Sequence, residues 1–194
     1  MKIIAVSAFA AGLVLAGSAG AANVVVDALG NSSSGGVGAV TGLNLTSGQA
    51  FTVTVNPGDL WNAGALPRWS NADGLTHDLF ATGTDDSGQA AGTKIGQDFG
   101  LWTQNGLTAP YGTLVGDIGG VFHVLGTNFA GPAWGTGALT LYYWDSNNGD
   151  NTQFITASVN AAGVPEPAAW ALMIAGFGMV GLTLRGRATV AIKA

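Results

Sequence analysis

Short runs of alternating apolar and polar residues, each ended by a cluster of turn residues, constrain the fold of this chain most strongly. The clearest run is Phe51–Val55, in which every second side chain is apolar, as on a strand with one buried face. A strong turn sequence, Asn56–Asp59, follows it directly. Glycine makes up 32 of the 194 residues, which suits strands joined by tight turns better than it suits helices.

Several further runs share this character. The predicted strands are Asn23–Ala28, Ala50–Val55, Gly112–Ile118, Gly120–Leu125, Ala138–Trp144 and Gln153–Val159. About seven or eight short strands without a long amphipathic helix predict an all-β domain, either an antiparallel β-sandwich or a jelly-roll. The polar region Asn71–Gly106 is less regular, and is either a long functional loop or an ordered surface excursion.

The charges of the body, Asn23–Gly163, are strongly one-sided. It holds ten aspartates and no glutamate against Arg68 and Lys94, which gives a net charge of −8. Such a body would repel nucleic acid, whose partners have basic surfaces. It suits hard cations, which prefer carboxylate and carbonyl oxygens. The alternative is that the aspartates occupy turns and keep the domain soluble.

The chain contains no cysteine. Disulfide scaffolding, thiol catalysis and cysteine-ligated metal sites are therefore excluded.

The N-terminal 22 residues have the features of a secretory signal peptide. Lys2 supplies a positive charge, Ile3–Gly17 is an apolar run, and small residues follow as far as Ala22. The apolar run is too short for a convincing membrane-spanning helix. We expect signal peptidase to cleave after Ala21 or Ala22 and the chain to be exported through the inner membrane.

The C-terminal residues 164–194 combine a proline-rich break with an apolar segment. The prolines of Val164–Pro167 disfavour both helix and strand. Residues 168–184 are uncharged and are predicted to form a transmembrane helix, although 17 residues extend only roughly 25 Å. Basic residues follow this segment, and by the positive-inside rule they should stay in the cytoplasm. A plain tail anchor would explain the apolar run and the charges, but not the prolines.

This tail resembles the PEP-CTERM sorting signal of Gram-negative bacteria in its Pro-Glu-Pro-x-x-Trp-Ala form. The matching residues are Pro165, Glu166, Pro167 and Trp170, followed by Arg185 and Arg187. The usual dense arginine cluster is thinned here. The resemblance implies recognition by an exosortase-type protease, transient membrane anchoring, and delivery to the outer surface or an extracellular polysaccharide matrix. The predicted organisation is a signal peptide at 1–22, a β-sandwich at 23–163 and a sorting signal at 164–194.

A loop rich in side-chain oxygens follows the aromatic strand of the body. Seven residues of Asp145–Thr152 carry a carboxylate, amide or hydroxyl oxygen. Calcium takes six to eight oxygen ligands, so the loop is chemically suited to it, although its spacing is not that of an EF-hand. An Asx-rich hairpin loop without a metal is the alternative.

The order of motifs in the body resembles that of small soluble bacterial lectins that bind galactose. The motifs are Asn56–Asp59, Arg68–Trp69, Gly112–Gly119, Gly137–Asp145 and Asp150–Asn151. The resemblance implies a β-sandwich that binds sugar through calcium. By the family pattern, the side chains of Asp145, Asp150 and Asn151 and a backbone carbonyl near Ala63 would hold calcium, and the sugar hydroxyls would bind the same ion.

Sugar contacts outside the calcium ligands are less closely specified. The resemblance points to His77 as the sugar-contacting histidine. Trp69 and Trp61 could stack on a sugar ring, and the alternative is that they are core or turn residues. The loop between Asp145 and Phe154 is shorter than in the family, so one carbonyl ligand has no counterpart.

Motifs typical of catalysis are missing from the sequence. It contains no Gly-x-Ser-x-Gly, no His-Glu-x-x-His and no phosphate-binding loop. We therefore predict a non-enzymatic surface or matrix protein that binds carbohydrate through calcium. The alternatives are a structural protein of an exopolysaccharide or biofilm matrix without a ligand, and a secreted glycan-active enzyme.

Overall fold

The computed structural model of the chain describes residues 20–161, the body, and residues 167–188, a helix. The body and the helix belong to separate units, and each is described by itself. Most of the predicted signal peptide 1–22 lies outside the described residues, as do Pro165 and Glu166 of the predicted sorting signal.

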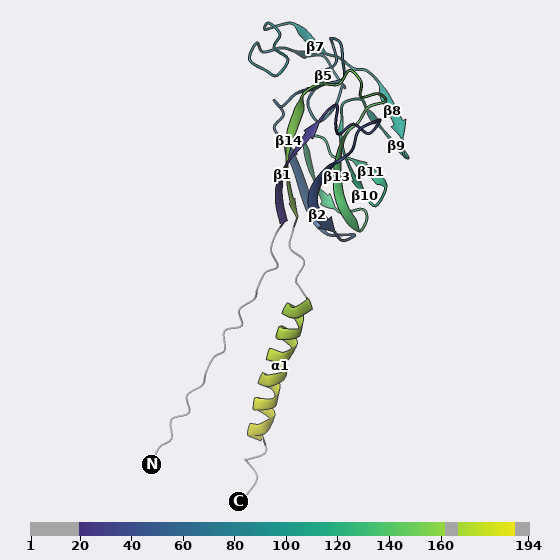
Figure 1. Ribbon diagram of the computed structural model, residues 1–194. Helices are drawn as coiled ribbons and strands as arrows, with labels where there is room; N and C mark the ends of the chain where they lie inside the picture. The colour runs from purple at the N-terminus through teal and green to yellow at the C-terminus, as the bar shows by residue number, and fades with distance from the viewer. Residues whose placement is uncertain (1–19, 162–166, 189–194) are drawn as a thin grey trace, which may run out of the picture. The chain divides into compact units, whose positions relative to one another are not determined.

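Two four-stranded sheets, all antiparallel in their pairing, form the framework of residues 20–161 (Figure 1). The first sheet has the order β1 (Gly20–Asp27), β14 (Phe154–Ala161), β3 (Ala50–Val55) and β12 (Asn128–Pro132). The second has the order β11 (Val121–Val124), β10 (Leu114–Ile118), β13 (Gly137–Tyr143) and β2 (Ala39–Leu45). The prediction of an all-β, antiparallel body is confirmed.

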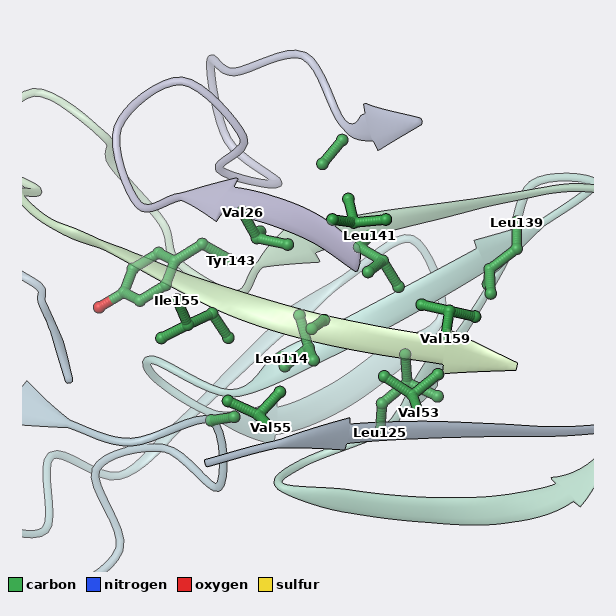
Figure 2. Close-up of a cluster of buried hydrophobic side chains, with 14 of the residues drawn as sticks. Val26, Val53, Val55, Leu114, Leu125, Leu139, Leu141, Tyr143, Ile155 and Val159 are labelled. Carbon is green, nitrogen blue, oxygen red and sulfur yellow. The ribbon is translucent and has the colours of Figure 1, made fainter. Parts of the chain in front are cut away.

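One hydrophobic core takes side chains from both sheets, because alternate residues of each strand point inward. In β3 the buried residues are Phe51, Val53 and Val55, the pattern predicted from the alternating sequence. Leu141 and Tyr143 of β13 are fully buried in the same core. Figure 2 shows Val53 and Val55 of the first sheet and Leu141 and Tyr143 of the second among the clustered core side chains.

Three short hairpins lie outside the two sheets. They are β4 (Trp61–Asn62) with β5 (Trp69–Ser70), β6 (Leu79–Phe80) with β7 (Lys94–Gly96), and β8 (Leu101–Gln104) with β9 (Leu107–Pro110). The irregular region 71–106 is thus an ordered excursion with strands of its own. The hairpin β8–β9 covers Trp144, whose indole N–H donates to the carbonyl of Trp102 at 3.1 Å.

Helix α1 (Pro167–Ala188) begins at the last proline of the predicted break and covers the predicted helical range. Nevertheless, no helix in residues 20–161 and 167–188 is long and apolar enough to cross a membrane. The prediction of a transmembrane helix at 168–184 is therefore not supported. The uncharged run is only 17 residues long and includes Gly176, Gly178 and Gly181.

Candidate metal centre

Asp145 lies two residues beyond the end of β13, in a position fixed by the loop that follows β1. Its backbone N–H donates to the Ser33 hydroxyl at 3.2 Å. The Ser33 hydroxyl in turn donates to the backbone carbonyl of Asp145 at 3.1 Å. The Ser146 N–H donates to Asp145 Oδ1 at 2.6 Å. Asp145 is 5% exposed, so its carboxylate is held almost out of water.

Burial raises the pKa of Asp145. A hydrogen bond from the Asn151 side chain and the backbone N–H groups of Ser146 and Asn147 oppose this shift, whereas the neighbouring Asp150 carboxylate adds to it. A buried carboxylate with a raised pKa is one that a cation would stabilise in its charged form.

Asn151 supplies an oxygen with no partner. The residue is 3% exposed, and its amide nitrogen donates to the carbonyl of Ala28 at 3.1 Å. Its Oδ1 is buried, and no hydrogen-bond donor reaches it in the described residues. A buried acceptor left unpaired costs about 1–3 kcal/mol, so this oxygen is suited to coordinate a cation.

The loop Asn62–Gly64 brings the Ala63 carbonyl to the same place. Two backbone hydrogen bonds join Asn62 to Thr152, at 3.0 and 3.1 Å, and fix this loop beside Asp150 and Asn151. A Cβ on Gly64 would lie only 2.2 Å from Asp150 Oδ2, and the glycine has a φ of +111°. Glycine therefore allows the carboxylate to approach the backbone next to Ala63.

The structure thus brings together the four residues predicted to bind calcium: Asp145, Asp150, Asn151 and Ala63. We call this set the oxygen cluster. In the part of the chain that the structure describes, no three His, Cys, Asp or Glu side chains are grouped to hold a metal. The oxygen cluster has two carboxylates, and its other donors would be the amide and the carbonyl. Such mixed oxygen donors fit calcium, whereas they fit zinc poorly.

Tyr143 lies fully buried among the charges of this region. Burial raises its pKa well above the ordinary value, Asp145 and Asp150 add to the shift, and Arg68 opposes it. Its hydroxyl is a second buried oxygen without a partner in the described residues. The edge of its ring packs against Trp61 at 4.5 Å between ring centroids and an interplanar angle of 85°.

The residues predicted to contact sugar directly do not form a sugar-stacking surface. His77 is exposed, and its Nδ1 lies 2.9 Å from the hydroxyl of Thr76. Trp69 is 9% exposed and packs in a small second core with Leu60, Ala81 and Ile95. Trp61 is fully buried. The burial of both tryptophans argues against their stacking on a sugar ring and favours the alternative that they are core residues.

Two further features lie beside the oxygen cluster and were not identified from the sequence. Arg68 Nη1 is 3.4 Å from the Ala63 carbonyl oxygen and 3.7 Å from Asp150 Oδ2. The guanidinium carbon lies 4.5 Å from the centre of the Phe99 ring, and Phe99 packs edge-on against Tyr111 at 5.2 Å. Phe99 is 39% exposed, so an aromatic surface borders the oxygen cluster. The sequence named Arg68 as one of two basic residues of the body and as part of the motif Arg68–Trp69, but did not place it beside the predicted calcium ligands.

The raised pKa of Asp145 predicts how stability depends on pH when a chelator keeps metal away. The folded protein binds this proton more tightly than the unfolded chain, whose carboxyl titrates near pH 4. The free energy of unfolding should therefore fall as the pH rises from about 4 through the folded pKa. We expect Asp145→Asn to remove this loss and to be more stable than the wild type at pH 7. Urea unfolding at several pH values checks this, and a less stable variant at pH 7 would contradict it.

Known proteins with a similar sequence or structure provide no family assignment for this chain. A scan against protein-family models finds no match, and a search of curated proteins finds none. Among solved structures, the chain is similar to one described as "EclA N-terminal domain; PllA-like lectin". The two are 17% identical with a TM-score of 0.46, over 72% of this chain and 95% of that chain. A likeness of this size assigns neither fold nor site to this chain.

Proposed function

We propose that the body is a β-sandwich that binds carbohydrate through a calcium ion held by the oxygen cluster. The single observation that carries this proposal is the buried, unpartnered Oδ1 of Asn151 beside the buried carboxylate of Asp145. The unpaired amide oxygen is unfavourable where it is buried, and a bound cation would stabilise both this oxygen and the charged form of the carboxylate. The carboxylate of Asp150 and the carbonyl of Ala63 would supply the remaining protein oxygens.

The oxygen cluster leaves room for a ligand on the ion. Calcium takes six to eight oxygens, more than these four residues supply with single contacts. Asp150 has a side chain that is 52% exposed, so one side of the cluster is open to solvent. Two neighbouring hydroxyls of a sugar could complete the coordination there, and Phe99 with Tyr111 offers an aromatic surface next to it. This arrangement supports binding rather than catalysis.

Capture of sugars on a glycan array, with calcium and with chelator, tests the proposed function. We expect bound glycans, galactose-terminated ones among them, to be lost when chelator is added and recovered when calcium is restored. Glycan binding that persists in chelator would contradict the role of the ion. A complete lack of binding in calcium would favour the alternative of a structural matrix protein without a ligand.

We also propose that the protein is exported and that residues 164–194 act as a sorting signal read by an exosortase-type protease. The support is the sequence alone: the signal-peptide features of residues 1–22 and the Pro-Glu-Pro motif at 165–167. The protein would then reach the outer surface or an extracellular polysaccharide matrix. Mass spectrometry of the protein recovered from outside the cell tests this, because a chain that keeps both ends intact would contradict it.

A further inference from the structure

Arg68 occupies a position in which a positive charge competes with a metal ion. Its Nη1 lies within 3.4 Å of the Ala63 carbonyl oxygen and 3.7 Å of Asp150 Oδ2, two of the proposed calcium ligands. An ion bound to either oxygen at about 2.4 Å would therefore lie within about 6 Å of the guanidinium nitrogen. At that distance the two positive charges repel each other, and they seek the same lone pairs.

The position of Arg68 is built into the fold. Its backbone carbonyl accepts a hydrogen bond from the Ala63 N–H at 3.0 Å, so the arginine and the carbonyl belong to one hairpin, β4–β5. Its guanidinium packs over the ring of Phe99, which is itself held by Tyr111. Arginine over an aromatic face is a favourable arrangement, and it holds the charge beside the oxygen cluster as long as no ion is bound.

Little else in the body could supply such a charge. Lys94 is the other basic residue between Asn23 and Gly163, and its ammonium pairs with Asp78 at 2.7 Å. The side chain of Arg68 is 36% exposed, which leaves it free to turn toward solvent without unfolding the hairpin. It can therefore give up Asp150 when an ion binds.

We propose that Arg68 is an internal cation that competes with calcium for Asp150 and the Ala63 carbonyl, and so lowers the calcium affinity of the oxygen cluster. The proposal rests on the calcium centre proposed above. In the absence of the ion, Arg68 partly neutralises the carboxylates; when calcium is abundant, the ion displaces the guanidinium. We therefore expect the site to bind calcium only at high concentration, with a dissociation constant like that of extracellular calcium-binding modules, about 10⁻⁴–10⁻³ M.

Calcium titration of Arg68→Met by calorimetry tests the proposal. Methionine keeps an unbranched apolar side chain against Phe99 but removes the charge, so the variant should bind calcium roughly tenfold more tightly than the wild type. Arg68→Gln, a second neutral variant, should shift the affinity in the same direction. Arg68→Lys keeps the charge and should stay closer to the wild type than either. The rise in melting temperature at a fixed calcium concentration should also be larger in the neutral variants.

Lys94→Met is the matched control. It removes the other positive charge of the body, which pairs with Asp78 instead of with a residue of the oxygen cluster. Its calcium affinity should change by less than about twofold. If the wild type binds calcium but the neutral Arg68 variants bind it equally or more weakly, the competition is refuted and the calcium centre stands. If neither the wild type nor any Arg68 variant binds calcium, the proposed centre itself fails.

Discussion

Replacing Asp145 by alanine is expected to lower the calcium affinity of the body by more than about 100-fold. Substitutions in the outer shell of metal sites already cost about 10–100-fold, and Asp145 would be a direct ligand. It is also the most deeply buried carboxylate of the oxygen cluster. The loss of its charge would leave Asp150 as the only carboxylate of that cluster. The rise in melting temperature on adding calcium should disappear with it.

Thermal unfolding with calcium and with chelator measures this effect. Asp78→Ala serves as the control, because it removes one carboxylate from an exposed ion pair with Lys94 and leaves the oxygen cluster intact. That variant should keep the calcium-dependent shift of the wild type. An Asp145→Ala protein whose shift equals that of the wild type would remove Asp145 from the set of ligands.

Replacing Trp61 by alanine is expected to reduce the free energy of unfolding by about 3–5 kcal/mol. The side chain is fully buried, and its indole N–H lies 2.9 Å from the carbonyl of Gly112 and 3.2 Å from that of Asn71, donating to both. Its ring also packs against Tyr143, next to the oxygen cluster. Truncation would leave a cavity and two weakened acceptors in the same place.

Unfolding by urea at constant pH measures this loss. Leu101→Ala is a suitable control, because Leu101 is 65% exposed on β8 and its truncation should change stability by no more than about 0.5 kcal/mol. A Trp61→Ala protein that loses less than about 1 kcal/mol would show that the ring is not the core residue that the structure describes.

Alternation of apolar and polar residues located three of the predicted strands closely, whereas β10 and β11 lie within their predicted ranges without strict alternation. β3 was predicted with its observed bounds, Ala50–Val55, because its buried residues alternate with polar ones and a turn ends it. β13 and β14 differ from their predicted ranges by a residue or two at their ends. Local pattern was sufficient here because each strand has one face in the shared core.

Of the strands in the two four-stranded sheets, two were missed because they break that pattern. β2 contains Gly42, whose φ is +77°, and its pairing with β13 shifts register between Ala138 and Thr140. β12 is an edge strand that includes Gly131 and Pro132, residues that are unfavourable within a strand. Both strands form because the neighbouring strands provide hydrogen bonds and a hydrophobic surface, and a local sequence window does not contain that information.

The candidate site was predictable to a similar extent. The oxygen-rich loop after β13 was visible in the sequence, and the resemblance to lectins added the carbonyl of Ala63. The sequence could not reveal that Arg68 also lies against Asp150, because that contact depends on how the hairpin β4–β5 packs beside residues 150–152. Whether Trp61 and Trp69 are buried or exposed likewise depends on tertiary packing, since a tryptophan suits both a core and a sugar-binding surface.

Calorimetric titration of the metal-free wild-type protein with calcium measures directly whether the oxygen cluster is a metal centre. We expect saturable binding of one calcium ion per chain, through the oxygen cluster. Titration with magnesium under the same conditions should show much weaker binding, because magnesium demands near-ideal octahedral geometry and gives up its water reluctantly. A calcium titration without measurable binding up to millimolar concentrations would rule out a calcium centre in the oxygen cluster.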